Sequence, residues 1–263
     1  MYTGFEAMDL SILRLLLSFA ILTPSTVLDV KFREVPDEFW IGGLILGLAI
    51  NIVEVLTGHL EILKLLTSLA VGCVMGFSLF YVGFFGGADS KALIFLSFTL
   101  PENPTLIKQL GVSLNIPVIT VFNNAITLSL CYPLAIAILN VKEFVEGRDP
   151  LRGLYVKGVF QRIVLFLTVR RTSFEELRRK AGYYPAEQPH EENGRIFRRP
   201  IYFMKAETDK EELLQKLEPY ADKGLYQDGI LVSPTIPFIT FIMLGLACLP
   251  IGDFILTLVS LIK

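Results

Sequence analysis

The sequence is poor in charge and in residues that commonly hold metals. Only 19% of its 263 residues are Asp, Glu, Lys or Arg, whereas soluble domains carry about a quarter. The net charge of −2 argues against a nucleic-acid-binding protein, which needs a strong basic excess. Its three cysteines stand singly in apolar stretches and its two histidines lie far apart. We therefore expect neither a thiolate zinc site nor a disulfide framework, and no cofactor.

Long apolar runs take the place of the missing charge. Hydrophobic residues make up 52% of the chain, and the mean hydropathy is +0.56. A helix needs about 20 apolar residues to cross about 30 Å of hydrocarbon. Trp40 stands near the start of one such run, where an interfacial aromatic residue is expected. The runs that meet the requirement are 10–28, 39–56, 62–85, 116–139 and 235–262.

A shorter apolar segment, 90–100, ends at a Pro-Glu-Asn-Pro run. Its helix would cover only about 17 Å, so by length alone it either crosses or re-enters the membrane. The basic residues favour a crossing, because 17 of the 24 Lys and Arg residues lie between 141 and 230. With a crossing, these share one face with the basic residues that flank the other segments. The sequence thus predicts an all-α polytopic membrane protein with six transmembrane helices and both termini outside.

The region 141–230 differs from the rest, with 17 basic and 15 acidic residues. Helix starts are expected at Thr172-Ser173 and at Thr208, and a strand at 195–205. Residues 151–169 mix apolar and basic side chains, which suits an amphipathic helix on an anionic leaflet. We predict a small mixed α/β cytoplasmic domain here. The domains are then 1–140 with helices one to five, the insert 141–230, and 231–263 with helix six.

Two acids stand at the ends of predicted membrane segments. Asp29 closes the first and Asp89 opens the fourth, both at the predicted cytoplasmic face. A carboxylate at membrane depth is costly, so the two together are a candidate general acid/base pair. The structural alternatives are that Asp89 caps its helix and that Asp29 pairs with a nearby basic residue. Glu54 and Asp253 fall near the opposite face, where interface anchoring is sufficient explanation.

The residues around both acids form a recognisable pattern. The first part is Asp29-x-x-x-Arg33-x-Val35-Pro36-Asp37, and the second, about fifty residues on, is Gly86-Gly87-Ala88-Asp89-Ser90-Lys91. This pattern resembles the prepilin and preflagellin peptidases, which are GxGD-type intramembrane aspartic proteases. Ala88 stands where that pattern has glycine. The stretch 233–238, Ser-Pro-Thr-Ile-Pro-Phe, is similar to the proline-rich start of the last segment in archaeal members.

The resemblance implies that Asp29 and Asp89 are the catalytic pair of an archaeal-type endopeptidase. Its substrate would be a preflagellin or a type IV prepilin-like precursor, cut behind a short basic leader at the cytoplasmic membrane face. Partners would be that precursor and membrane lipid, without nucleic acid. Bacterial members also methylate their product and carry a cysteine-pair loop, but here only 32–38 joins the first two segments. No methyltransferase activity is therefore expected.

Residues near the pair are assigned supporting roles. Gly86, Gly87 and Ala88 would allow a tight turn, and Arg33 and Pro36 would support the motif loop. Lys91 would orient the substrate or simply snorkel to the interface. Asn123 and Asn124 would either bond across helices or line the cleft. Possible substrate contacts are Glu34, Asp37, Glu38, Asn123, Asn124 and Pro237.

A pair of carboxyl groups implies a mechanism without a covalent intermediate. The two groups share one proton; the ionised group activates water and the protonated one donates to the scissile carbonyl. Helix dipoles favour Asp89 as the resting base and Asp29 as the resting acid. The rival function is a proton- or cation-coupled transporter, which predicts repeats and acids along a pathway. A non-catalytic scaffold would leave both aspartate motifs without a purpose.

Overall fold

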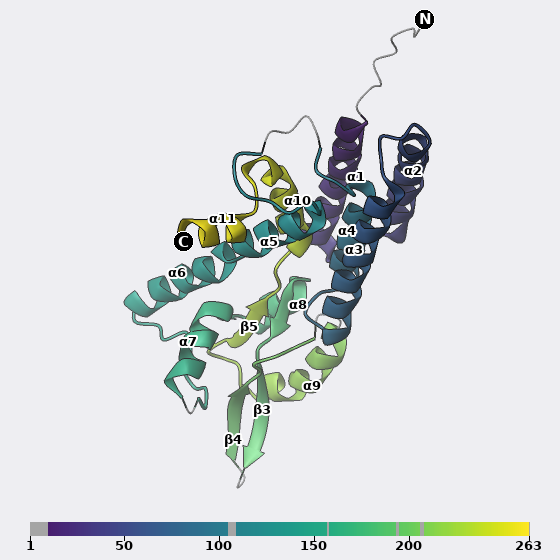
Figure 1. Cartoon of the computed structure of the whole chain (residues 1–263). Helices are drawn as coiled ribbons and strands as arrows, with labels where there is room; N and C mark the ends of the chain where they lie inside the picture. The colour runs from purple at the N-terminus through teal and green to yellow at the C-terminus, as the bar shows by residue number, and fades with distance from the viewer. Residues whose placement is uncertain (1–9, 105–108, 157, 193–194, 206–207, 263) are drawn as a thin grey trace, which may run out of the picture. The chain divides into compact units, whose positions relative to one another are not determined.

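The computed structural model describes residues 10–104, 109–156, 158–192, 195–205 and 208–262. The chain divides into two compact units, drawn in Figure 1. The first unit comprises Met1–Leu128 and Pro237–Lys263, and the second comprises Ser129–Ile236. The charged region 141–230 lies wholly within the second unit.

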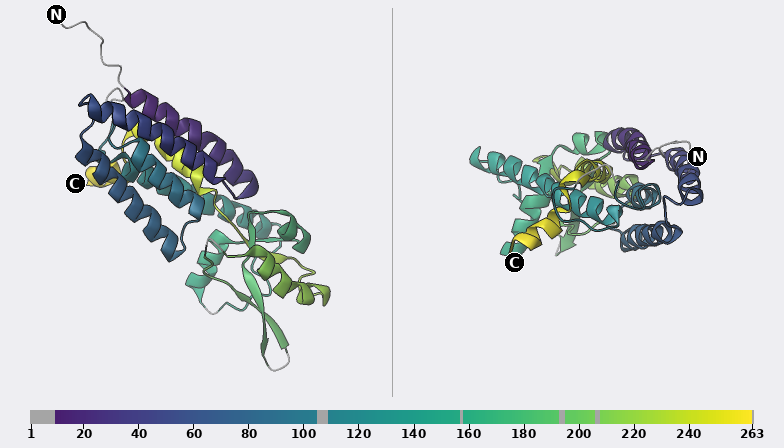
Figure 2. Two further views of the ribbon diagram at one scale, coloured as in Figure 1. Left: turned by 90° about the vertical axis from the view of Figure 1, so that its right-hand side faces the viewer. Right: turned by 45° about the horizontal axis from the view of Figure 1, so that its top comes forward.

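The first unit is a bundle of helices. In Figure 2 its long helices run beside one another as rods. Its elements are α1 (Ser11–Phe32), α2 (Asp37–Leu56), α3 (Ile62–Val82), α4 (Gly87–Thr99), α5 (Pro117–Ser129), α10 (Phe238–Ala247), the 3₁₀ turn η1 (Leu249–Ile251) and α11 (Phe254–Ile262).

Four helices in the described part of the chain are long and apolar enough to cross a membrane. They are α1, α2, α3 and the stretch Pro117–Val145, which joins α5 to α6 (Cys131–Val145). Helix α10 and the helix after it bend by 49°, and would add a fifth span if they act as one. Helix α4 has 13 residues, about 20 Å, which is too short to cross alone. The predominantly helical class is confirmed, whereas six crossings are not.

Helix α4 is buried among α1, α2, α3 and α10. Ala92, Leu93 and Phe95 on this helix have no exposed surface. Its neighbours approach closely because two of them present glycines four residues apart, a spacing that lets helix backbones pack together. These glycines are Gly43 and Gly47 on α2 and Gly72 and Gly76 on α3. The enclosure fixes the helix that carries Asp89.

Trp40 packs inside this core and does not face outward as an interfacial aromatic residue would, so the interfacial prediction was wrong. Its side chain is 3% exposed, and its ring centroid lies 6.0 Å from that of Phe95. Gly43, one turn further along α2, would place a Cβ only 2.6 Å from the same ring. Because Gly43 has no side chain, the Phe95 ring has space to pack against Trp40.

The two acids assigned to interface anchoring are buried instead. Glu54 is 6% exposed and forms an ion pair with Arg14, which is 3% exposed. Asp253 has no exposed surface, and Asn123 Nδ2 donates to it at 2.8 Å. A polar partner inside the bundle offsets the cost of burying each carboxylate. Sequence position indicated where along the helix each acid lies, but not which way it faces.

The second unit mixes helices and strands, as predicted for the charged insert. A three-stranded antiparallel sheet has the order β1-β5-β2, and β3 and β4 form a separate hairpin. Arg170 on β1 lies opposite Val232 on β5, and Glu187 on β3 opposite Pro200 on β4. Besides α6, the elements are α7 (Val159–Thr168), β1 (Arg170–Thr172), α8 (Phe174–Arg179), β2 (Tyr183–Pro185), β3 (Glu187–Glu192), β4 (Arg195–Pro200), α9 (Lys210–Asp222) and β5 (Ile230–Pro234).

The predicted helix starts in this unit hold to within a residue. Ser173 caps α8, and its hydroxyl accepts from the Glu176 N–H at 3.1 Å. Helix α9 is capped by Asp209, which accepts from the Glu211 N–H at 2.8 Å, and not by Thr208. Thr208 instead donates to a preceding backbone carbonyl. Both residues are good N-caps, so the sequence alone did not distinguish them.

Two other predictions in this unit were too long. Helix α7 begins only at Val159, because the backbone of Gly158 is extended. The strand expected over 195–205 ends at Pro200, since proline has no N–H to continue a ladder.

Candidate active site

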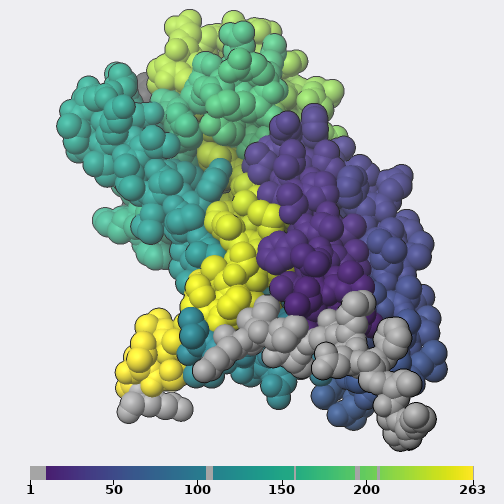
Figure 3. Space-filling view, turned by 90° about the horizontal axis from the view of Figure 1, so that it is seen from above, coloured from purple at the N-terminus to yellow at the C-terminus, as the bar shows by residue number. Residues whose placement is uncertain are grey.

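Asp29 and Asp89 come together where the ends of three helices meet. Asp29 lies in the last turn of α1 and is 8% exposed, and Asp89 lies in the first turn of α4. The two carboxyl groups are within electrostatic range of each other, and the backbone N–H of Ile239, second residue of α10, faces both. The purple surface of α1 and the yellow surface of α10 lie side by side in Figure 3. Residues separated by about 60 and 150 positions along the chain thus form one site.

Asp89 also closes the start of its own helix. The Gly86 N–H donates to Asp89 Oδ2 at 3.3 Å, which is the reciprocal half of a helix cap. The capping role considered for this residue is therefore present. A carboxylate in the first turn of a helix is stabilised by the helix dipole. Capping explains the contact of one oxygen of Asp89. It does not explain why Asp29 lies close to it.

Asp29 has one oxygen near a cation and one without a donor. Its Oδ1 lies 3.9 Å from Arg33 Nη1. Its Oδ2 is buried and makes no hydrogen bond of normal geometry with the residues that the structure describes, although the Ile239 N–H faces the carboxyl group. A buried acceptor without a donor is costly. This oxygen is the one that a shared proton, a water molecule or a substrate group would reach.

Arg33 ends α1 in a left-handed conformation. Its φ is 60° and its ψ 20°, and its N–H donates to the carbonyl of Asp29 at 3.1 Å. Among the described residues it is the one non-glycine residue with a positive φ. Such a conformation is uncommon outside glycine and is often found at functional sites. It turns the chain sharply from α1 into the loop that leads to α2.

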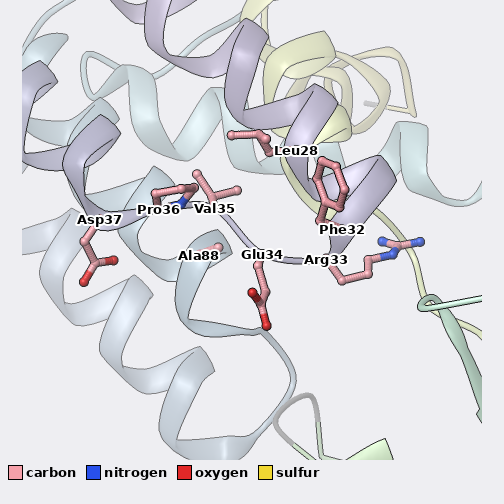
Figure 4. A pocket seen from close by; sticks show the side chains of 8 residues that line it. All are labelled: Leu28, Phe32, Arg33, Glu34, Val35, Pro36, Asp37 and Ala88. Atoms are coloured by element: carbon pink, nitrogen blue, oxygen red, sulfur yellow. The ribbon is translucent and has the colours of Figure 1, made fainter.

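A pocket of about 530 Å³ opens beside this turn. Figure 4 shows Glu34 near Ala88, with Asp37 further along the loop and the Arg33 guanidinium turned away from both. Neither aspartate lines the pocket, but Leu28 and Ala88, which do, directly precede Asp29 and Asp89. The lining is Leu28, Phe32, Arg33, Glu34, Val35, Pro36, Asp37 and Ala88. An apolar pocket with acidic edges thus adjoins the aspartate pair.

Lys91 and Asp37 are bound to each other at the edge of this region. Lys91 Nζ lies 2.6 Å from Asp37 Oδ1, and both side chains are largely exposed. The pair joins the second turn of α4 to the first turn of α2, which begins after Pro36. Lys91 therefore has a protein partner. Glu34 in the loop and Glu38 in the first turn of α2 are exposed acids without an ion pair among the described residues.

Asn123 and Asn124 follow the cross-helix alternative. Asn124 Nδ2 donates to the Gly252 carbonyl at 2.9 Å, and its Oδ1 accepts from the Phe254 N–H at 2.8 Å. With the bond from Asn123 to Asp253, these contacts fasten α5 to the start of α11. Neither side chain lines the pocket. Their amides stabilise the bundle.

The N-terminus of α10 is the part of the site that the sequence did not identify. Pro237 is its N-cap, and Phe238 stacks on Phe85 with ring centroids 4.4 Å apart. Phe122 makes edge contacts with both rings. This aromatic cluster holds the Ile239 N–H beside the aspartates. The stretch 233–238 is rich in proline, but side-chain types do not reveal which backbone N–H will face the aspartates.

The described residues contain no group of three or more His, Cys, Asp or Glu side chains arranged to hold a metal. The site itself brings together two carboxyl groups, one backbone N–H and a nearby guanidinium.

Comparison with known proteins gives two family matches. The type IV leader peptidase family matches residues 15–145, and the archaeal peptidase A24 C-terminus type II matches residues 161–254. A preflagellin peptidase of Methanocaldococcus jannaschii is 26% identical over 165 residues, which are 59% of this chain and 66% of that protein. The chain therefore spans about two thirds of that relative's length. No solved structure matches. The first match contains Asp29 and Asp89, and the second contains Ile239.

Proposed function

The chain belongs to the type IV leader peptidase family, and from this we propose that it is an aspartic endopeptidase of the membrane. It would remove the leader peptide from a preflagellin or prepilin-like precursor, at the cytoplasmic edge of the bilayer. The observation that supports the chemistry is the meeting of Asp29, Asp89 and the Ile239 N–H at three helix ends. The Methanocaldococcus relative is a preflagellin peptidase, which supports a preflagellin as the substrate class.

In the proposed reaction the two aspartates share one proton. Asp89 begins as the anion, because it lies at a helix N-terminus, and Asp29 begins protonated, at a helix C-terminus. Asp89 takes a proton from water, the resulting hydroxide attacks the scissile carbonyl, and Asp29 donates its proton to the carbonyl oxygen. Collapse of the tetrahedral intermediate breaks the C–N bond, and the proton on Asp89 passes to the leaving amine. The pair then regains its single proton from the product carboxyl.

The pocket indicates how a substrate would be oriented at the aspartate pair. Its apolar lining suits a substrate side chain next to the scissile bond, while the acids at its edge suit a basic leader. Asp37 is already engaged by Lys91. Glu34, exposed and on the same lining, is therefore the acid best placed to attract the leader. Electrostatic attraction at an exposed site weakens with salt, so leader affinity should do the same.

The test is cleavage of a tagged precursor by the full chain in detergent. Asp29→Asn and Asp89→Asn should each lower the rate by at least about 100-fold, since proton transfer contributes about 10²–10⁴-fold. Asparagine keeps an oxygen for the Gly86 N–H, so the cap of α4 survives in Asp89→Asn. Glu61→Gln, whose side chain is 71% exposed, is the control and should cleave normally. Near-normal cleavage by either aspartate variant would refute the aspartic mechanism.

A further inference from the structure

Helix α7 in the second unit carries an apolar face that the unit itself does not cover. Val159 is 76% exposed, Phe160 78% and Ile163 52%. On the opposite side Leu165 is 1% exposed and packs into a core cluster of the unit. A short helix with one buried and one bare apolar side needs a second apolar environment.

The same helix is fastened to α6 by a buried side chain. Asn140 on α6 has no exposed surface. Its Nδ2 donates to the carbonyl of Phe166 at 2.8 Å and to that of Val169 at 2.7 Å. These are the carbonyls that the end of a helix leaves without internal donors. The C-terminal end of α7 is thereby held at the level of Asn140.

Taken as one span, the stretch Pro117–Val145 puts that level at the membrane surface. The candidate span Pro117–Val145 has 29 residues, about 44 Å of helix, of which the hydrocarbon accounts for about 30 Å. Counted from Pro117, Asn140 lies about 35 Å along, in the headgroup layer on the far side. The apolar side chains of α6 before and after this level are bare, with Ile138 69% and Phe144 62% exposed. Helix α7 packs against α6, so two neighbouring helices present bare apolar side chains.

The charges around the face suit an anionic leaflet. Arg162 is exposed on α7, Arg152 is exposed just before it, and Lys142 is exposed on α6. Glu143 is the acid on this part of α6, and Glu146, which follows the helix, is ion-paired with Arg148. Basic residues beside an apolar helix face are the usual composition of an interfacial helix.

We propose that α7 is an interfacial helix that inserts Val159, Phe160 and Ile163 into the lipid leaflet beside the end of α6, with Arg152 and Arg162 at the headgroups. Its ligand is a lipid surface with anionic headgroups. The helix would hold the inserted unit against the membrane independently of any substrate.

The test uses the full chain with Cys73, Cys131 and Cys248 replaced by alanine, reconstituted in vesicles. Phe160→Cys receives a bimane label, and Lys216→Cys on α9, a site 66% exposed, is the matched control. The vesicles contain phosphatidylcholine and phosphatidylglycerol, with or without a doxyl-labelled lipid. We expect the doxyl lipid to quench the label at 160 at least threefold more than the label at 216, and aqueous iodide to show the reverse order.

Labels at other positions along α7 show whether the result at 160 is caused by that one substitution. Labels at 159 and 163 should follow the label at 160, whereas a label at 168, exposed near the end of the helix, should not. Replacing phosphatidylglycerol with phosphatidylcholine should lessen the lipid quenching. Equal quenching at 160 and 216 would overturn the proposal. Protection from iodide that disappears on dilution in excess lipid would also overturn it, because it would assign the face to a second copy of the chain.

Discussion

At the scale of single residues, the end of α1 combines an unusual backbone with a charge. Arg33 adopts a conformation that glycine adopts more readily, and its guanidinium lies near Asp29. Backbone preference alone would select glycine at such a helix C-terminus. The guanidinium therefore offers a reason to keep an arginine where the backbone disfavours one.

Arg33→Gly should separate these two contributions. Glycine relieves about 1 kcal/mol of left-handed strain, so thermal unfolding in detergent should occur at the same or a higher temperature. Removal of the charge beside the aspartates should slow precursor cleavage by roughly tenfold. Arg33→Lys, which keeps the charge and the strain, should retain more activity than Arg33→Gly. Full activity in Arg33→Gly would show that the charge plays no part in the reaction.

The buried pair of Glu54 and Arg14 is a second case at this scale. Glu54→Leu leaves the Arg14 guanidinium buried without that carboxylate, and the free energy of unfolding should fall by about 3–5 kcal/mol. The double variant Arg14→Met with Glu54→Leu should recover much of the loss, because apolar replacements of buried pairs are often neutral. Denaturation of the purified protein in mixed micelles measures both. A double variant less stable than Glu54→Leu alone would contradict this account.

At the scale of elements, the position of α4 depends on glycines of its neighbours. Neighbouring glycines on α2 allow a direct comparison. A Cβ on Gly43 would lie 2.6 Å from the Phe95 ring and 3.0 Å from Ile21, whereas a Cβ on Gly42 would meet nothing within 4 Å. A substitution at Gly43 therefore tests the packing of α2 against α4, whereas the same substitution at Gly42 tests only its effect on α2.

Gly43→Val should push α4 away from α2 and displace Asp89 with it. Overpacking of this kind costs about 1–3 kcal/mol, and cleavage should fall further than stability, because small displacements of catalytic groups are costly. Gly42→Val should leave both nearly unchanged. Thermal unfolding and cleavage of the tagged precursor measure the two effects. If the two valine variants behave alike, the close approach of α2 to α4 does not position the site.

The helices also show what sequence can and cannot predict. Length and hydropathy were enough for α1, α2 and α3, and the polar pattern predicted the helix starts of the second unit to within a residue. Trp40 was assigned to the interface because its actual partner, Phe95, is distant in sequence. The run 235–262 reads as one span, yet its helix breaks after Ala247 and the two parts bend by 49°. Side-chain patterns reveal a face or an end, whereas partners distant in sequence decide what that face contacts.

At the scale of the whole molecule, the two units differ in how their charged side chains are paired. The first unit buries a few acids, each against a named partner. The second unit holds a network in which the buried Arg198 donates to both oxygens of the exposed Asp228 at 2.7 Å and lies 3.5 Å from the buried Glu187. Although burial opposes it, the bonds and charge of Arg198 lower the pKa of Asp228. This network ties the hairpin β3–β4 to the turn before β5.

Glu187 gives this network a pH dependence. Burial raises the pKa of Glu187, which has no exposed surface and accepts from the Leu231 N–H at 3.0 Å. The folded unit therefore binds this proton more tightly than the unfolded chain. Its stabilising effect is complete below the ordinary glutamate pKa and is lost as pH rises through the raised value. Asp228, with its lowered pKa, stays ionised over the mildly acidic and neutral range and adds no slope there.

Hydrogen exchange of the full chain should reveal this slope at Leu231. After correction for intrinsic exchange rates, the free energy of opening at this amide should be higher near pH 5 than near pH 8 in the wild-type protein. Glu187→Gln keeps an oxygen for the Leu231 N–H but has no proton to lose, so its opening free energy should be the same at both pH values. Glu191→Gln, an exposed change on the same strand, should retain the wild-type slope. A slope that persists in Glu187→Gln would assign the pH dependence to another group of the unit.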